Sequence, residues 1–289
     1  QRNGRAMQKV SSVRTAQNLT LSLTKARFMN KILVIGLGGT IGSVAGESIS
    51  LDDNCLKILS VTEHKNVLFE GISPFKVLSE NMAKGLWQKL IDCLDEVDFS
   101  KYKGVIILHG SDTLAFTSAI IANAFADKNI VLVASDKPVE NPLSNAKANF
   151  DAAVAHLLSD KSGVYVSYNG IKRANCITSA DINDEFRAIS HFPAPTGKKK
   201  ISNKNVLIIK PYVSMDFGAY NFDDVDEVLI EMYHSATVPD STKKFAKSLN
   251  IPYHFVTHKM SADYETAQDI ENIIFGTTIE NAYAMSILE

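Results

Sequence analysis

The sequence predicts an α/β protein with two units: a larger N-terminal unit, doubly wound around a mainly parallel sheet, and a smaller C-terminal α/β unit. First, short apolar runs alternate with segments of helical spacing, as in chains of βαβ units. Second, runs such as "GVIILHG" at 104–110 are apolar without interruption, which is typical of parallel strands covered on both faces. Third, two prolines, a glycine and a lysine run interrupt this alternation at 190–204 and predict a linker or a mobile loop there.

The elements of the larger unit follow in order along the chain. Strands are predicted at 31–39, 66–73, 104–110, 129–135 and 163–170, and helices at 84–97, 118–126 and 145–159. The helix at 84–97 is the clearest, since its spacing places four apolar side chains on one face: Leu86, Leu90, Cys93 and Leu94. The smaller unit has predicted strands at 205–212, 227–233 and 251–258 and helices at 242–250 and 278–288.

The predicted domain organisation has four parts. Residues 1–28 carry six basic residues and no acid, a composition shared by organellar presequences and by vector leaders or an upstream misread. Met29 resembles a natural start, so we expect 1–28 to lie outside the fold. Residues 29–189 form the N-terminal domain, 190–204 the linker, and 205–289 the smaller domain.

Composition excludes several classes of protein. The formal net charge is −2. Without the six basic residues of 1–28, 24 basic and 32 acidic residues remain, a net charge of −8 that does not favour nucleic acid. A run of 18 apolar residues is absent, which argues against a membrane span. Three scattered cysteines and no CxxC pair indicate a reducing compartment. We therefore expect a cytoplasmic protein, or an organellar one if 1–28 is a genuine presequence.

Polar residues follow two of the predicted strands at their carboxyl ends. "GLGGTIG" ends the first strand and "LHGSDT" follows the third, so Thr40, Ser111, Asp112 and Thr113 are expected on one rim of the sheet. The hydroxyls of Thr40 and Ser111 and the carboxylate of Asp112, gathered there, suit acyl transfer. A dinucleotide fingerprint would need glycine where Ile41 stands, and the P-loop pattern is absent. A plain strand–helix turn is the simplest alternative for the glycine-rich segment alone.

The pair of motifs "GGTIG" and "HGSDT" resembles the asparaginase/glutaminase amidohydrolase family, whose usual forms are GGTI and HGTDT. Further segments are similar to that family: "LSENM" at 78–82, "VASDKPVENPLSNAKANFDAAV" at 133–154, "EMYHSATVP" at 231–239 and "TIENAYAMSIL" at 278–288. The resemblance extends over about residues 30–289, and the short loops look nearer the cytoplasmic type than the periplasmic type.

The resemblance implies a role for each matching position. Thr40 would be the nucleophile that attacks a side-chain amide, and Ser111, in place of the family's second threonine, would position water or relay a proton. Asp112 would hold the α-amino group of the substrate. The remaining implied substrate-binding residues are Ser79, which would bind the α-carboxylate, Glu80, Gly39 and Gly110. The resemblance implies no cofactor, an amide amino acid as the small-molecule partner, and a homodimer or homotetramer.

Two departures from the family pattern concern proton transfer. Ile177 stands where the family has a lysine, and the family's tyrosine position falls near Ser48, since residues 29–101 contain no tyrosine. The C-terminal turn of glycine and asparagine has become "HSAT" at 234–237. Lys172 and Lys137 are candidate substitutes for the lysine, although exposed surface positions are the simpler interpretation of both.

Two functions are therefore weighed. The first is an asparaginase-like amidohydrolase that releases aspartate and ammonia, and the second is a weakened homologue that binds a small amino acid as a sensor or scaffold. A tRNA-linked amidotransferase component is a third, disfavoured because no added N-terminal domain is present. His254 and His258 could bind zinc on a helix, but "IPYHFVTH" is strand-like, so no metal is expected. His109 is expected to be a structural hydrogen-bonding group.

Overall fold

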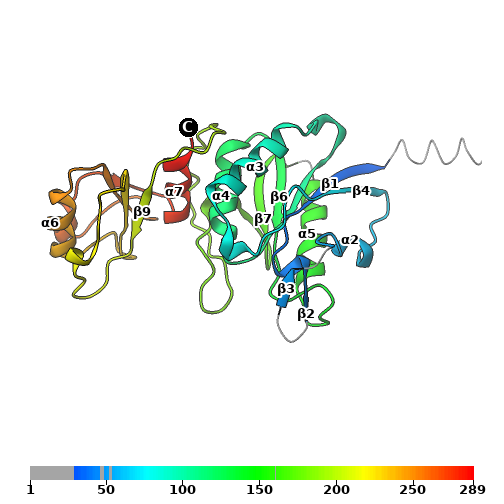
Figure 1. Cartoon of the computed structure of the whole chain (residues 1–289), viewed down its shortest axis with the longest axis horizontal. Helices are drawn as coiled ribbons and strands as arrows, with labels where there is room; N and C mark the ends of the chain where they lie inside the picture. The colour runs from blue at the N-terminus through cyan, green and yellow to red at the C-terminus, as the bar shows by residue number, and fades with distance from the viewer. Residues whose placement is uncertain (1–28, 46–48, 52–53, 160) are drawn as a thin grey trace, which may run out of the picture.

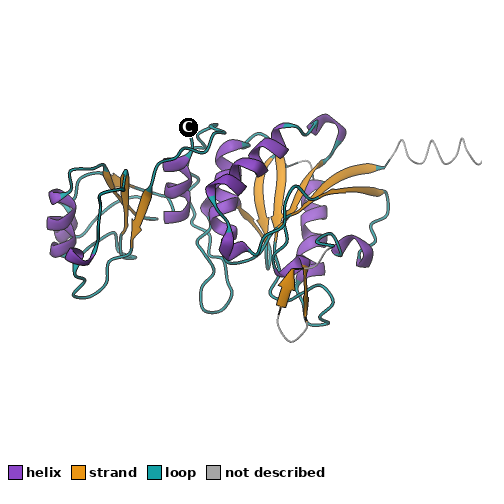
Figure 2. Ribbon diagram, in the orientation of Figure 1, coloured by secondary structure: helices purple, strands orange, loops and turns teal. Residues whose placement is uncertain are grey.

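The computed structural model describes residues 29–45, 49–51, 54–159 and 161–289. In this part the chain forms a six-stranded and a four-stranded sheet, and β2 (Ser43–Ala45) pairs with β3 (Ile49–Leu51) as a hairpin (Figure 1). Figure 2 shows helices packed around both larger sheets. The predictions for residues 1–28 and for Ser48 lie outside the described residues.

The six-stranded sheet has the order β4-β1-β5-β6-β7-β8. Every neighbouring pair is parallel except β7 and β8. Its strands are β1 (Asn30–Gly36), β4 (Val67–Ile72), β5 (Gly104–Leu108), β6 (Asn129–Val133), β7 (Gly163–Ser167) and β8 (Ile171–Arg173). The sheet is thus mainly parallel, as predicted. β8 was not predicted, because its three residues are too few to show a period.

Helices cover both faces of this sheet. Leu33 and Ile35 pack towards α3 (Lys84–Asp95) and α4 (Leu114–Ala124), whereas Ile32 and Val34 pack towards α2 (Ile58–Val61) and α5 (Ala146–Leu157). Alternate residues of a strand point to opposite faces, so a strand covered twice must be apolar throughout. Burial of each such side chain contributes about 1.5–3 kcal/mol.

The four-stranded sheet is wholly parallel, with the order β12-β11-β10-β9. Its strands are β9 (Val206–Ile209), β10 (Glu227–Glu231), β11 (Tyr253–Val256) and β12 (Ile273–Ile274). α6 (Asp240–Ser248) packs on one face and α7 (Ile279–Ile287) on the other. The predicted fold class, with a larger and a smaller α/β unit, is confirmed.

α7 also joins the two units. Ala282 packs on the four-stranded sheet, while Ala284 and Ile287 belong to the core that α4 shares with the six-stranded sheet. In Figure 1 the helix lies between the two sheets. The C-terminal helix is therefore buried from both sides.

Segment 190–204 is anchored by the end of the chain. Ile201 forms a bridge with Leu288, and Lys200 exchanges two backbone hydrogen bonds with Glu289, at 3.2 and 2.8 Å. The Lys199 ammonium pairs with Asp95 on α3, 2.5 Å away. A run of lysines that looks like a solvated loop in sequence is thus tied to both units.

Short 3-10 helices complete the fold: Thr40–Gly42, Ser79–Asn81, Phe99–Lys101, Ala174–Cys176, Phe217–Ala219 and Glu265–Ala267. All three cysteines have free thiols. None of the helices within the described ranges is both long enough and apolar enough to cross a membrane.

Candidate functional site

The two glycine-containing motifs leave the six-stranded sheet side by side. Gly36 and Leu108, the last residues of β1 and β5, are register partners. The Leu37 N–H continues the pairing by donating to the Leu108 carbonyl at 3.1 Å. The segments that carry Thr40 and Ser111 therefore start from adjacent points on the carboxyl edge of the sheet, which we call the rim.

Gly39 brings the two motifs into backbone contact. Its φ of +71° lies in the region that L side chains rarely adopt, and a Cβ built on it would lie 2.2 Å from the Gly110 nitrogen. Only glycine allows two backbones this close. Thr40 and Ser111, each the next residue after one of these glycines, are half-buried, so both lie beside the crossing and neither is enclosed in the core.

A third segment joins the same point. The Val77 N–H donates to the Leu37 carbonyl at 2.8 Å and sets the chain beside the first motif. Ser79 is buried, and its Oγ donates to Asp112 Oδ2 at 3.3 Å. The Thr113 hydroxyl donates to the Ser79 carbonyl at 2.8 Å, which fixes the two segments together.

The rim thus collects the predicted site residues from three segments. A Cβ on Gly110 would lie 2.4 Å from Ser79 Oγ, so this glycine is required by close approach. Asp112 and Glu80 are exposed. A carboxylate open to solvent, with a hydroxyl on one side, can bind an ammonium group.

The family follows from a further observation on the same segments. The family model described as "Asparaginase, N-terminal" matches residues 31–205. The chain belongs to the asparaginase family.

Solved structures of asparaginases share the fold. L-asparaginase I from Vibrio cholerae superposes with a TM-score of 0.69 and 19% identity, over 90% of this chain and 92% of that one. The thermostable L-asparaginase from Thermococcus kodakarensis gives a TM-score of 0.63 and 20% identity, over 88% and 86%.

Curated relatives match over part of their length. A glutamyl-tRNA(Gln) amidotransferase subunit from Aeropyrum pernix is 30% identical over 132 residues, which are 43% of this chain and 31% of that protein. The L-asparaginase of Thermococcus kodakarensis is 30% identical over 147 residues, 48% of this chain and 44% of that protein. The matched region thus spans less than half of either relative.

His109, within the asparaginase-like "HGSDT", is buried beside the site. Its Nδ1 lies 2.7 Å from the Gly110 carbonyl, which can only accept, so Nδ1 carries the proton. Nε2 is buried and has no partner among the described residues. Burial lowers the pKa of His109 to about 4, against smaller opposing effects of the Gly110 bond and Asp112. The ring is therefore neutral near pH 7 and orients the Gly110 peptide.

A pH prediction follows from this shift. The folded pKa lies below the usual 6.5, so the unfolded chain binds a proton first as the pH falls. Above pH 6.5 the ring is neutral in both states, so His109 does not lower the free energy of unfolding. Between pH 6.5 and about 4, the free energy of unfolding decreases by about 3 kcal/mol. We expect the His109 ring resonances to stay constant from pH 8 to about pH 5 in an NMR titration. A midpoint near 6.5 would contradict the burial argument.

Ile177, which the sequence resemblance predicts at the position of the family's lysine, lies in the core. It is 1% exposed, forms an isolated bridge with Ala188, and belongs to the same apolar cluster as Phe186. Because no charge is available at that position, any basic group near Ser111 would have to come from another segment.

The two candidate lysines have other partners. Lys172 Nζ donates to the Tyr168 carbonyl at 2.9 Å, and Lys137 Nζ pairs with Asp136 at 2.8 Å. Within the described ranges, no lysine side chain bonds to Ser111 or Asp112. Neither candidate replaces the missing lysine in this conformation.

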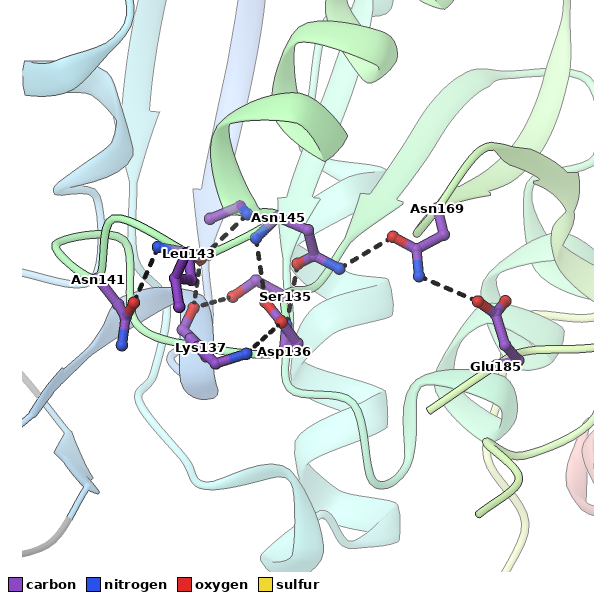
Figure 3. A network of polar contacts seen from close by, with 10 residues as sticks. Ser135, Asp136, Lys137, Asn141, Leu143, Asn145, Asn169 and Glu185 are labelled. Carbon is purple, nitrogen blue, oxygen red and sulfur yellow. Dashed lines mark hydrogen bonds and ion pairs between the residues drawn. The ribbon is translucent and has the colours of Figure 1, made fainter. Parts of the chain in front are cut away.

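A polar network borders the rim at the end of β6, as Figure 3 shows. Asp136 and Asn145 each accept the other's backbone N–H at 3.0 Å, and Asn145 Nδ2 donates to Asn169 Oδ1 at 3.1 Å. Asn169 Nδ2 in turn donates a hydrogen bond to Glu185 Oε1 at 3.2 Å. Burial opposes ionisation of Asp136, but the Asn145 N–H and the Lys137 ammonium together lower its pKa. Sequence reasoning missed this network, since its only local signal was the polar "SDKPVENPLSN" loop.

The two histidines considered as zinc ligands do not lie on a helix. His254 lies within β11, where its Nδ1 is 3.3 Å from Glu227 Oε1, and His258 follows the strand. Among the described residues, no three His, Cys, Asp or Glu side chains are grouped to hold a metal ion.

Proposed function

We propose that this protein hydrolyses the side-chain amide of L-asparagine, or of a similar small amide, with Thr40 as the nucleophile. The observation that supports the proposal is the close backbone approach of Gly39 and Gly110, which directly precede Thr40 and Ser111 in the chain. The membership of the chain in the asparaginase family supports the same chemistry.

Each rim residue then has a role. The Thr40 oxygen attacks the amide carbon, the C–N bond breaks, and ammonia leaves with a proton; water then hydrolyses the ester to release aspartate and restore Thr40. Backbone N–H groups of the glycine-rich segment can stabilise the oxyanion. Asp112 binds the α-ammonium group and Ser79 the α-carboxylate, while the Ser111 hydroxyl relays a proton.

The rate depends on a base near Thr40, and neither Ile177 nor the two candidate lysines supplies one among the described residues. A neutral threonine hydroxyl is a weak nucleophile unless a neighbouring group takes its proton. Ile177 is buried and apolar, and Lys137 and Lys172 bond elsewhere. General acid–base help is worth about 10²–10⁴-fold, so we expect turnover slower than in a relative with the lysine by about that factor.

The same observation favours a second candidate function. If no base reaches Thr40, the Ser79–Asp112 pair could still hold an α-amino acid, so the protein would act as a binding homologue. Aspartate binding without ammonia release would distinguish this function from hydrolysis.

The deciding experiment measures ammonia release from L-asparagine. We expect the Thr40→Ala variant to lose at least 10³-fold in kcat, because the nucleophile is removed. Asp112→Asn should raise KM by about 10–100-fold through loss of the charge-assisted bond. Thr266→Ala, at an exposed position of the smaller unit, is the matched control and should retain wild-type rates. Equal residual activity in wild type and Thr40→Ala, with aspartate bound by both, would instead support the binding function.

A further inference from the structure

The turn between β7 and β8 contains the pair Asn169–Gly170, and both residues are exposed. No other asparagine of residues 29–289 precedes a glycine. Asparagine is a thermolabile residue, because the backbone nitrogen of the next residue can attack its side-chain amide. Glycine hinders this attack least, since it carries no side chain. The turn therefore contains the dipeptide that is most open to this intramolecular reaction.

The backbone of this turn leaves the attacking nitrogen free. Asn169 has a φ of +46°, in the left-handed region that asparagine tolerates. Gly170 has a φ of +112°, and a Cβ built on it would meet no atom within 4 Å. The Gly170 N–H donates no hydrogen bond to another of the described residues. A reaction at this nitrogen therefore has open space and breaks no hydrogen bond of the sheet.

Both ends of the Asn169 amide are held by neighbours. Asn145 Nδ2 donates to Asn169 Oδ1 at 3.1 Å, as Figure 3 shows. Attack at the amide carbon moves negative charge onto Oδ1, and a donor already directed at that oxygen stabilises this charge. On the other side, Asn169 Nδ2 donates to Glu185 Oε1 at 3.2 Å. The contact with Asn145 thus favours the reaction, while the contact with Glu185 depends on the nitrogen that would leave.

We propose that Asn169 is a site of spontaneous deamidation, independent of the amide hydrolysis proposed above. The Gly170 nitrogen loses its proton to hydroxide and forms a bond to Asn169 Cγ. The Cγ–Nδ2 bond breaks, and Nδ2 takes a proton from water and leaves as ammonia. Water then opens the five-membered succinimide, at Cγ to give aspartate or at the main-chain carbonyl to give isoaspartate. One water is consumed and one ammonia is released in all.

The product breaks a contact of the network that borders the rim. Residues 177–189 form a hairpin closed by the bridge between Ile177 and Ala188, and Glu185 of this hairpin accepts the Asn169 amide. A carboxylate at position 169 has no N–H to donate to Glu185, and it places a second negative charge beside that side chain. Like charges this close repel. Deamidation therefore releases the 177–189 hairpin from Asn169.

Peptide mapping of the full chain after incubation at mildly alkaline pH tests the reaction. Cleavage after Lys161 and Lys172 releases peptide 162–172, in which Asn169 is the single asparagine. We expect this peptide to gain one dalton as incubation proceeds, and part of it to become a substrate for protein isoaspartyl methyltransferase. If it stays unmodified while the synthetic peptide of the same sequence converts, the proposal is overturned.

Asn66 supplies a matched control within the same chain. It is exposed and has a φ of +65°, close to that of Asn169, but the next residue is Val67. The branched side chain of valine hinders attack by its nitrogen, so Asn66 should stay intact while Asn169 converts. Equal conversion at both positions would contradict the role assigned to Gly170.

The structural consequence is tested with Asn169→Asp, which reproduces one product. We expect backbone amides of the 177–189 hairpin to exchange with deuterium about 5–30-fold faster than in wild type, because a hydrogen bond to a carboxylate is lost. Adding Glu185→Gln supplies an N–H for the new carboxylate and should restore slow exchange. Asn66→Asp, the matched charge change, should leave the hairpin unaffected. Wild-type exchange in Asn169→Asp, or no rescue by Glu185→Gln, would overturn the release of the hairpin.

Discussion

Replacing Gly39 by alanine is expected to lower the free energy of unfolding by about 4 kcal/mol or more and to abolish activity at the rim. Two costs add. A φ of +71° strains any residue with a Cβ, by about 1–3 kcal/mol. The new Cβ would also lie 2.2 Å from the Gly110 nitrogen and 2.3 Å from its Cα, so the two motifs must separate. Urea unfolding followed by circular dichroism measures the first effect and ammonia release the second.

Two other glycines separate these costs. Gly170→Ala combines a φ of +112° with open space around the built Cβ, so it should show strain alone, about 1–2 kcal/mol. Gly85→Ala lies within α3 with nothing near its Cβ and should stabilise by about 0.5–1 kcal/mol. A Gly39→Ala variant no less stable than Gly170→Ala would show that the motifs do not touch.

Replacing Ile177 by lysine, the residue that the family resemblance predicts there, is expected to destabilise the fold by about 3–5 kcal/mol. Ile177 is 1% exposed in an apolar cluster with Phe186 and Ala174. The change removes packed apolar surface and places an ammonium group where the described residues offer no acidic partner within that cluster. Thermal and urea unfolding measure the loss.

A matched substitution lies a few residues away. Ile182 is 100% exposed, so Ile182→Lys should change stability by less than about 0.5 kcal/mol. The outcome that would contradict the core placement is an Ile177→Lys variant of wild-type stability with faster ammonia release, since its side chain would then reach Ser111.

Much of the rim could be predicted from local pattern. Apolar runs ending in "GGTIG" and "HGSDT" indicated parallel strands with polar residues at their carboxyl ends, and the register of Gly36 with Leu108 agrees. The glycine-rich segment alone was weak evidence, since a plain turn explained it, and its pairing with "HGSDT" about 70 residues later carried the prediction. These features depend on neighbours in sequence, where periodicity and conformational preference act.

Long-range contacts decided the rest. Glu280 faces Ser179 across 101 residues, Ile201 meets Leu288, and Asn169 joins Asn145 to Glu185. The members of these pairs lie 16 to 101 residues apart, too far for helix or strand periodicity to connect them. The sequence by itself identified the hydroxyl, carboxylate and glycine residues that are candidates for the rim, since side-chain chemistry and the conformational freedom of glycine are local properties. Only the tertiary structure decided that Ile177 is enclosed, that both candidate lysines bond elsewhere, and that one oxygen of the buried Glu280 has no partner among the described residues. Burial and partnership depend on how distant segments pack.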